Sequence, residues 1–86
     1  MNILITFRFM KSILIIEQVR LFSNWLIIIA NGREYKFIVR DLSPRLALAS
    51  EEDLNDFEVT PSGYGIHWRK IDEDISLAAL LETKPI

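Results

Sequence analysis

The sequence predicts a small α+β domain with a three-stranded antiparallel meander, two short helices, a second β-hairpin and a short C-terminal helix. Three observations support this prediction. Two early stretches are rich in apolar and β-branched residues, as strands are. Asn31-Gly32 separates the second of these stretches from a third one, and this dipeptide is a strong hairpin signal. Further along the chain, Ser-Pro and Ser-Glu pairs are typical of helix starts.

The first strand is expected over residues 13–20, where β-branched side chains are frequent. Residues 25–30 are nearly all apolar and predict a second strand, so both of its faces are expected to be covered. A third strand over residues 34–40 follows the turn at Asn31-Gly32. That turn favours type I′, because both of its central positions need a positive φ.

Two short helices are expected after the meander. Ser43 suits an N-cap, and Pro44 suits the first helical position, where its missing N–H costs nothing. Ser50 is followed by acidic residues at near-capping-box spacing, so a second helix is expected to begin there. This second helix places Leu54 and Phe57 toward the interior.

The last third of the chain predicts a hairpin and a helix. Residues 58–60 and 64–68 are expected to pair across a turn that contains proline and glycine. The acidic residues 72–74 interrupt the apolar pattern and predict a turn. Ser76 suits the N-cap of a final helix over residues 77–82, and negative charge is favourable beside the positive end of that helix.

Apolar positions that share one face of a strand or helix predict the core. These positions alternate in a strand and recur every three or four residues in a helix. The predicted core residues are Ile15, Val19, Leu26, Ile28, Tyr35, Phe37, Leu46, Leu54, Ile66, Trp68 and Leu80.

Residues 1–9 precede a second methionine, Met10, and have two interpretations. In the first, translation starts at Met10 and residues 1–9 are an upstream extension. In the second, they form an added edge strand, because apolar residues alternate along them. In both cases residues 10–86 form a single α+β domain.

Composition limits the classes of function. The net charge of −2 argues against a dedicated nucleic-acid binder. The charge is uneven, since residues 1–45 carry seven Lys and Arg against three Asp and Glu, a net +4, and residues 46–86 carry three against nine, a net −6. The longest uncharged run has twelve residues, fewer than the ~20 that span a bilayer, so we expect no membrane association. The lack of cysteine fits a cytoplasmic location.

His67 is the only histidine and lies close in sequence to Asp72, Glu73 and Asp74. Such a set suggests a metal site or a general acid–base pair. However, catalytic zinc sites often use more than one histidine, and these carboxylates lack the alternating ligands of an EF-hand loop. We therefore favour a solvated turn, with a partly exposed His67 bonded to a neighbour, and predict no catalytic, cofactor-binding or metal-binding residue.

The stretch Gly-Tyr-Gly-Ile-His-Trp at residues 63–68 is followed by Ile-Asp-Glu-Asp-Ile-Ser and a Leu-Leu pair. With Pro-Arg-Leu-Ala at residues 44–47, it resembles a bacterial domain-of-unknown-function family, number twenty-four forty-two in that series, over about residues 13–82. That family usually has Pro directly after the Trp. Arg69 stands there instead, and we expect it to pair with a nearby acid. The candidate interaction or motif residues are His67, Trp68, Arg69, Asp72, Glu73 and Asp74.

The resemblance implies a small α+β fold, often encoded beside a second small protein in an arrangement like a toxin–antitoxin pair, or joined to a helix-turn-helix domain. We hypothesise a non-enzymatic interaction domain without a cofactor, the antitoxin or accessory partner in such a pair, which binds a small partner protein or itself. The alternative is a transcription-regulator-associated domain that contacts nucleic acid through basic residues of the meander, namely Arg20, Arg33, Lys36, Arg40 and Arg45.

Protein binding also leads to an expectation for the surface. A chain of 86 residues can rarely cover both sides of an apolar sheet. An exposed apolar patch of more than a few hundred Å² is therefore expected. Its expected contributors are Ile3, Ile5, Phe7 and those of Leu26, Ile27, Ile28 and Ile29 that face outward.

Overall fold

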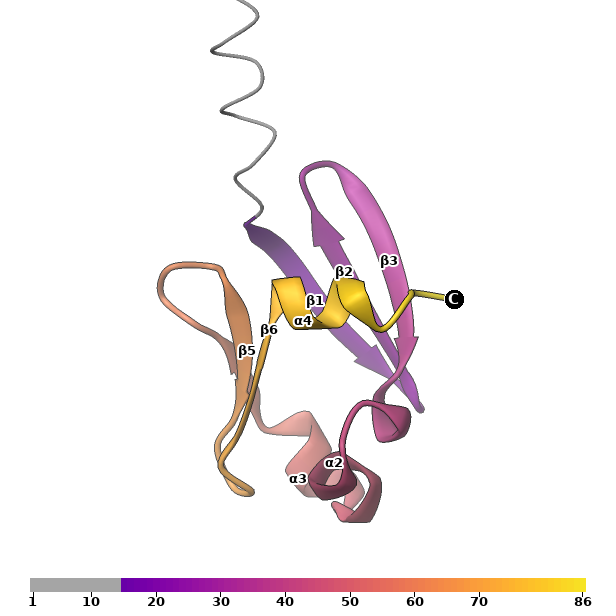
Figure 1. The fold of residues 1–86 in the computed structure, drawn as a ribbon. Helices are drawn as coiled ribbons and strands as arrows, with labels where there is room; N and C mark the ends of the chain where they lie inside the picture. Colours follow the sequence, from indigo (N-terminus) through magenta and orange to yellow (C-terminus); the bar gives the residue numbers. More distant parts are fainter. Residues whose placement is uncertain (1–14) are drawn as a thin grey trace, which may run out of the picture.

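The computed structural model describes residues 15–86 (Figure 1). Both interpretations of residues 1–9, and the patch contribution of Ile3, Ile5 and Phe7, lie outside the described residues. The elements are β1 Ile16–Phe22, β2 Trp25–Ala30, β3 Arg33–Ile38, the 3-10 helix η1 Val39–Asp41, α2 Pro44–Leu48, α3 Glu51–Asn55, β4 Phe57–Val59, β5 Gly65–Trp68, β6 Glu73–Ser76 and α4 Leu77–Glu82. Two antiparallel sheets with short helices confirm the predicted α+β class.

The first sheet has the order β1-β2-β3 and confirms the predicted meander. β1 covers Ile16–Phe22, and residues 13 and 14 of the predicted first strand lie outside the described residues. β3 ends at Ile38 rather than at residue 40. Asn31 and Gly32 connect β2 to β3 with φ angles of 55° and 76°. These are the positive values that a type I′ turn needs, so the predicted hairpin is confirmed.

A β-bulge in β1 explains one wrong core prediction. Strict alternation counted back from Val19 predicts that Ile15 points inward. The pairing register shifts between Ile16 and Gln18, however, and the extra residue reverses the alternation before it. Ile16 is accordingly only 5% exposed, whereas Ile15 is 43% exposed.

The second sheet has the order β4-β5-β6. Pairing of β4 with β5 confirms the predicted second hairpin. The predicted acidic turn is wrong at Glu73 and Asp74, which begin β6, because the chain turns earlier, over residues 69–72. Consecutive acids conceal the period-two pattern of β6, in which Asp74 is exposed and Ile75 packs against the core.

Gly65 allows β5 and β6 to lie close together. A Cβ atom at this position would lie 2.9 Å from the carbonyl oxygen of Ile75. A glycine inside a strand often marks such a close backbone approach. Any larger side chain at residue 65 would therefore push the two strands apart.

The three predicted helix N-caps are confirmed. The Oγ atoms of Ser43, Ser50 and Ser76 each accept a hydrogen bond from the backbone N–H three residues later, at 3.2, 3.1 and 3.0 Å. Each bond satisfies a donor that the helix leaves unpaired. Pro44 occupies the first turn of α2, as predicted. Within residues 15–86, no helix has the length and apolar character that crossing a bilayer requires.

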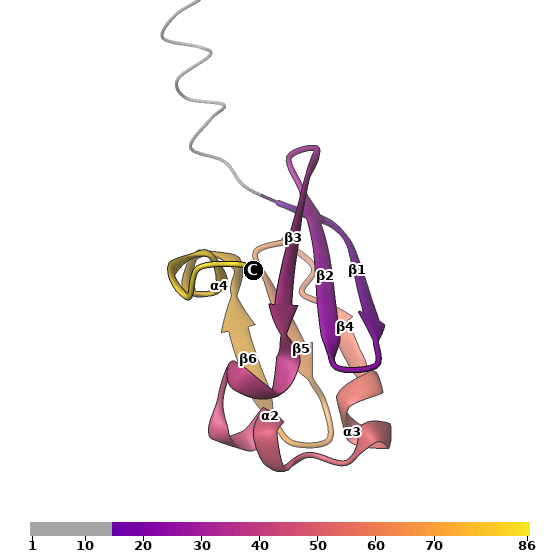
Figure 2. The same cartoon turned by 90° about the vertical axis from the view of Figure 1, so that its right-hand side faces the viewer.

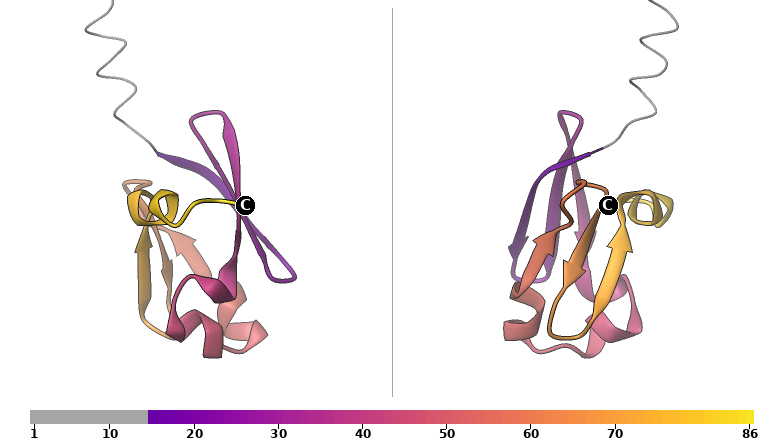
Figure 3. Two further views of the ribbon diagram at one scale, coloured as in Figure 1. Left: turned by 45° about the vertical axis from the view of Figure 1, so that its right-hand side comes forward. Right: turned by 90° about the vertical axis from the view of Figure 1, so that its left-hand side faces the viewer.

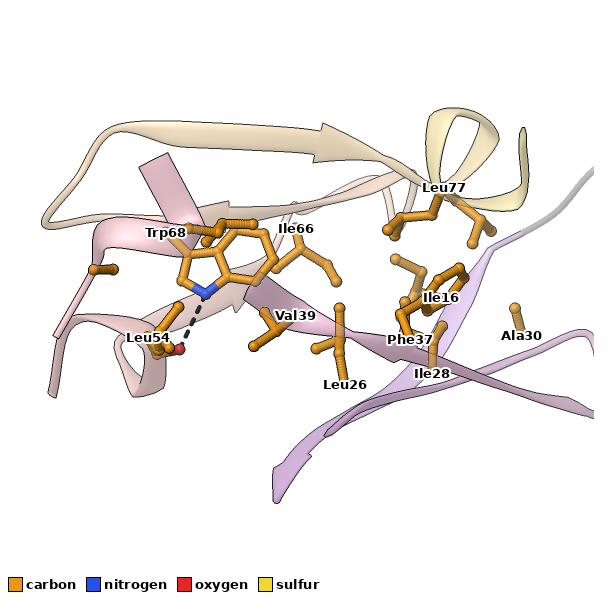
Figure 4. Close-up of a cluster of buried hydrophobic side chains, with 13 residues drawn as sticks. Ile16, Leu26, Ile28, Ala30, Phe37, Val39, Leu54, Ile66, Trp68 and Leu77 are labelled. Atoms are coloured by element: carbon orange, nitrogen blue, oxygen red, sulfur yellow. Dashed lines mark hydrogen bonds between the residues drawn. The ribbon is translucent and has the colours of Figure 1, made fainter. Parts of the chain in front are cut away.

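The two sheets face each other across one core, with α2 and α3 together at one end (Figures 2 and 3). Val19 and Tyr35 are partly buried against this core, and apart from Ile15 the other predicted core residues are buried. The buried hydrophobic side chains are Ile16, Leu26, Ile28, Ala30, Phe37, Val39, Leu46, Ala49, Leu54, Ile66, Trp68, Leu77 and Leu80 (Figure 4).

Candidate functional site

His67 lies on the solvent side of the second sheet, in the middle strand. Its neighbours across the strands are Glu58 on β4 and Asp74 on β6. The Nδ1 atom of His67 lies 2.7 Å from the Oδ1 atom of Asp74. An ionised carboxylate only accepts, so Nδ1–H donates this bond. The expectation of a partly exposed histidine bonded to a neighbour is confirmed.

Trp68 belongs to the core and not to a surface site. Its side chain is fully buried, and its Nε1–H donates a hydrogen bond of 3.0 Å to the carbonyl oxygen of Leu54 (Figure 4). Its ring packs against that of Phe57 with centroids 6.2 Å apart and planes tilted by 50°. The indole therefore ties α3 and β4 to β5, and it presents no surface to a partner.

Arg69 pairs with two acids, which confirms the expectation for this position. Its Nε donates to the Oδ1 atom of Asp56 at 2.8 Å, and its Nη1 lies 3.1 Å from the Oε1 atom of Glu58. The hydrogen bond to Asp56 is the main cause that raises the pKa of Arg69 above its ordinary value. Arg69 follows β5, Asp56 precedes β4 and Glu58 lies within β4, so the ion pairs hold these two strands together at the surface.

Asp72 and Asp74 approach His67 from the same side. One ligand atom from each of the three side chains lies within 4.8 Å of the others. A histidine and two carboxylates are ligand types that divalent cations accept. Here the Nδ1 atom of His67 is already bonded to Asp74, and both aspartates are exposed. The remaining acid of the motif, Glu73, lies opposite Trp68 and is partly buried.

The second sheet also has a small hollow of about 220 Å³. Asp74 lines it, together with other residues of β5 and β6 and with Thr60 and Tyr64 from the connection between β4 and β5, but His67 does not. The hollow therefore does not join the histidine to the carboxylates. In chemical terms, the described arrangement is a hydrogen-bonded cross-strand pair on a polar surface.

The first sheet has a different outer side, which we call the apolar face. It consists of three rows of cross-strand neighbours, one residue from each strand. The rows are Phe22–Trp25–Ile38, Arg20–Ile27–Lys36 and Gln18–Ile29–Glu34. The middle column on β2 and the whole first row are apolar, while two cations stand at the ends of the second row.

Exposure separates the two sides of β2. Leu26 and Ile28 are buried in the core, whereas Ile27 and Ile29 on the apolar face are partly exposed. Within residues 15–86, the outer side of this strand is therefore covered only in part, whereas we expected both sides to be covered. Trp25 is 37% exposed, and among residues 15–86 no helix or strand covers the apolar face in Figure 3 (left). Five large hydrophobic side chains thus remain at the surface of one sheet.

Phe22 is the residue of this face that the sequence analysis missed. It lay beyond the end of the first predicted strand at residue 20, yet it ends β1 opposite Trp25 and is 72% exposed. A hollow of about 470 Å³ begins beside it at the free edge of β1 and reaches Asn55 and Phe57. The period-two pattern of the strand, continued to Phe22, was the signal that would have placed it on the outer side.

The basic residues proposed to contact nucleic acid divide into two groups. Arg40 donates through Nη1 to the carbonyl oxygens of α2 and its C-cap, at 2.8 Å in the shortest bond. Arg45 donates to the carbonyl oxygens of residues 71 and 72. Both guanidinium groups therefore stabilise backbone, whereas Arg20, Arg33 and Lys36 are exposed on the first sheet.

Comparison with known proteins gives a family but no activity. A family model described as "Protein of unknown function (DUF2442)" matches residues 16–85. A solved crystal structure of a protein of unknown function from Rhodospirillum rubrum is similar, with 31% sequence identity and a TM-score of 0.73. The match covers 83% of this chain and 88% of that chain. No curated protein matches the chain.

Proposed function

Because the chain belongs to the DUF2442 family, whose function is unknown, we propose a function from its own surface. The domain is a protein-interaction module that binds another polypeptide chain through the apolar face of the first sheet. The observation that carries this proposal is the first row, in which Phe22, Trp25 and Ile38 form an apolar band that ends in a 72% exposed phenylalanine.

The physical reason is that such a face is unusual on an isolated domain. Antiparallel sheets that have one side in water normally alternate apolar residues inside with polar residues outside. β2 instead carries Trp25, Ile27 and Ile29 on the outer side. Contiguous exposed apolar surface marks interaction sites in soluble proteins. A partner that covers this face would remove these side chains from water and gain the associated free energy.

The kind of partner follows the family resemblance. We propose that a small protein encoded nearby occupies the face, as in a toxin–antitoxin-like pair in which this chain is the antitoxin or accessory member. The nucleic-acid alternative is weaker, because Arg40 and Arg45 already bond to backbone carbonyls. We assign no catalytic role to His67, since its bond to Asp74 is a cross-strand pair of a kind that stabilises sheets.

The test is co-purification of the tagged full-length chain from the host that carries its gene. One small protein should co-purify stoichiometrically with the wild type and be lost with Phe22→Thr combined with Trp25→Thr, since threonine preserves strand propensity. Leu48→Gln is the matched control, because Leu48 is 88% exposed on α2, away from the apolar face. The proposal is wrong if the double variant retains the partner, or if the wild type has none and stays monomeric at high concentration.

A further inference from the structure

The pattern of charge on the apolar face determines which occupant fits it. Arg20 and Lys36 lie at the two ends of the middle row, on either side of Ile27. Lys36 Nζ lies 3.9 Å from the carboxylate of Glu34 in an exposed contact, and such contacts contribute little. Within residues 15–86, Arg20 forms no ion pair. The face is thus an apolar column with one cation on each side.

A second copy of this chain fits this pattern poorly. A dimer with twofold symmetry presents the same patch from both copies. If the axis passes through Ile27, the middle rows meet, and Arg20 and Lys36 face cations of the other copy. Like charges brought together at an interface are costly. If the axis moves so that the middle row meets the row of Glu34, the apolar first row is left outside the contact.

Nucleic acid also fits less well, because its phosphate backbone satisfies cations but offers little to an apolar column. A polypeptide segment meets both demands when apolar side chains run along its centre and carboxylates flank them. The hollow at the edge of β1 provides room for such a segment beside Arg20 and Phe22.

We propose that the apolar face recognises an acidic amphipathic polypeptide segment, whose apolar residues cover Trp25, Ile27 and Ile29 and whose carboxylates pair with Arg20 and Lys36. This inference rests on the proposed function and adds the chemistry of the partner to it. The carboxylates select the partner and speed its approach, while the apolar residues hold it.

The probe is a phage-displayed library of random dodecapeptides, selected on the immobilised full-length chain. We compare the wild type with Arg20→Glu/Lys36→Glu and with the neutral variant Arg20→Gln/Lys36→Gln. Peptides enriched on the wild type should be apolar with an excess of Asp and Glu. Peptides enriched on the charge-reversed variant should carry Lys and Arg instead. A synthetic copy of a wild-type peptide should bind the reversed variant roughly tenfold or more weakly, with the neutral variant in between.

Arg33→Glu is the matched control. Arg33 is an exposed cation on β3, but it lies opposite the buried Ala30 and so points to the other side of the sheet. Reversal of this single charge should alter affinity less than about twofold, since exposed charges at a distance are screened.

Four results overturn this inference. Two of them concern the selected peptides: those enriched on the wild type carry no excess of carboxylates, or the charge-reversed variant enriches the same peptides. The third is that the wild type forms dimers as its concentration rises. The fourth is that the wild type binds a random single-stranded DNA more tightly than the peptides, and that the charge-reversed variant loses this DNA binding. If Phe22→Thr with Trp25→Thr leaves peptide binding unchanged, or no peptide is enriched, the proposed function fails with it. If that double variant abolishes binding and charge reversal does not, the proposed function stands and only the acidic partner is wrong.

Discussion

The outer sides of the two sheets differ in whether their side chains find interaction partners within the domain. On the second sheet, His67 bonds to Asp74, and Arg69 at the end of β5 pairs with Asp56 and Glu58. The polar groups there find partners within the domain. On the first sheet, the apolar residues of β2 that point outward, Trp25, Ile27 and Ile29, do not belong to the core that residues 15–86 form. The polar side chains of the motif around His67 are therefore hydrogen-bonded or ion-paired within the domain, whereas the outer side of β2 leaves apolar surface exposed.

The largest expected effect breaks the core that both sheets share. Trp68→Ala should lower the free energy of unfolding by about 3–5 kcal/mol, because it leaves a cavity between the sheets and the carbonyl of Leu54 without its donor. Urea unfolding measures this change. Trp25→Ala is the matched control and should cost less than half as much, since Trp25 lies at the surface. Equal losses at both tryptophans would contradict the assignment of core and face.

A substitution that pushes apart β5 and β6 of the second sheet should have a smaller effect on stability. Gly65→Ala places a Cβ atom 2.9 Å from the carbonyl oxygen of Ile75, which is backbone and cannot move aside cheaply. We expect a loss of roughly 1–3 kcal/mol, the range for overpacking. Hydrogen exchange should show faster opening of β6 than of β2. Unchanged exchange in β6 would show that the two strands tolerate more separation than their geometry indicates.

Phe22→Thr tests the outer side of the first sheet. The change in stability should stay within about 0.5 kcal/mol, because the phenylalanine is mostly exposed. Binding of a hydrophobic dye to the folded chain should fall, since the first row of the apolar face loses its most exposed member. Leu48→Gln removes another exposed apolar residue but should leave dye binding closer to that of the wild type, because Leu48 is isolated on α2.

The smallest expected effect concerns the second sheet. Addition of Mg²⁺ or Zn²⁺ should shift the melting temperature by less than about 1 °C, because stabilisation by a ligand requires tight binding to the folded state. Among residues 15–86, three side chains offer converging ligand atoms there, and the Nδ1 atom of His67 already bonds to Asp74. If the cation raised the melting temperature by several degrees and His67→Gln removed this rise, the motif would contain a cation site, contrary to our prediction.

Sequence preferences for helix caps and tight turns predicted the features that depend on a few neighbouring residues. Ser43, Ser50 and Ser76 cap helices, and Asn31-Gly32 makes the tight turn, because each depends only on residues within one turn. The pairing of Arg69 with an acid was also foreseen, since an exposed cation near several carboxylates seldom stays alone.

Other features depend on tertiary pairing and escaped prediction. The bulge that turns Ile16 inward in place of Ile15 is set by the register of β1 against β2. β6 forms because β5 offers it a free edge, and this support overrides the turn tendency of Glu73 and Asp74. The apolar face depends on the register in which β1, β2 and β3 pair, because this register decides which residues stand beside one another. Sequence patterns show which residues alternate, but not which side remains uncovered.

Each sheet is formed by one continuous part of the chain, residues 16–38 for the first and residues 57–76 for the second. Every strand pair within them therefore joins neighbours in sequence, and the packing of one sheet on the other brings distant residues together. Loops that close over few residues lose little entropy, and chains with such local pairing fold quickly. We expect the hairpin at Asn31-Gly32 to form early and the docking of the two halves to limit the folding rate. During that interval both sides of β2 are open to water, so a partner that binds the apolar face while the chain is being made would meet it before the core has closed.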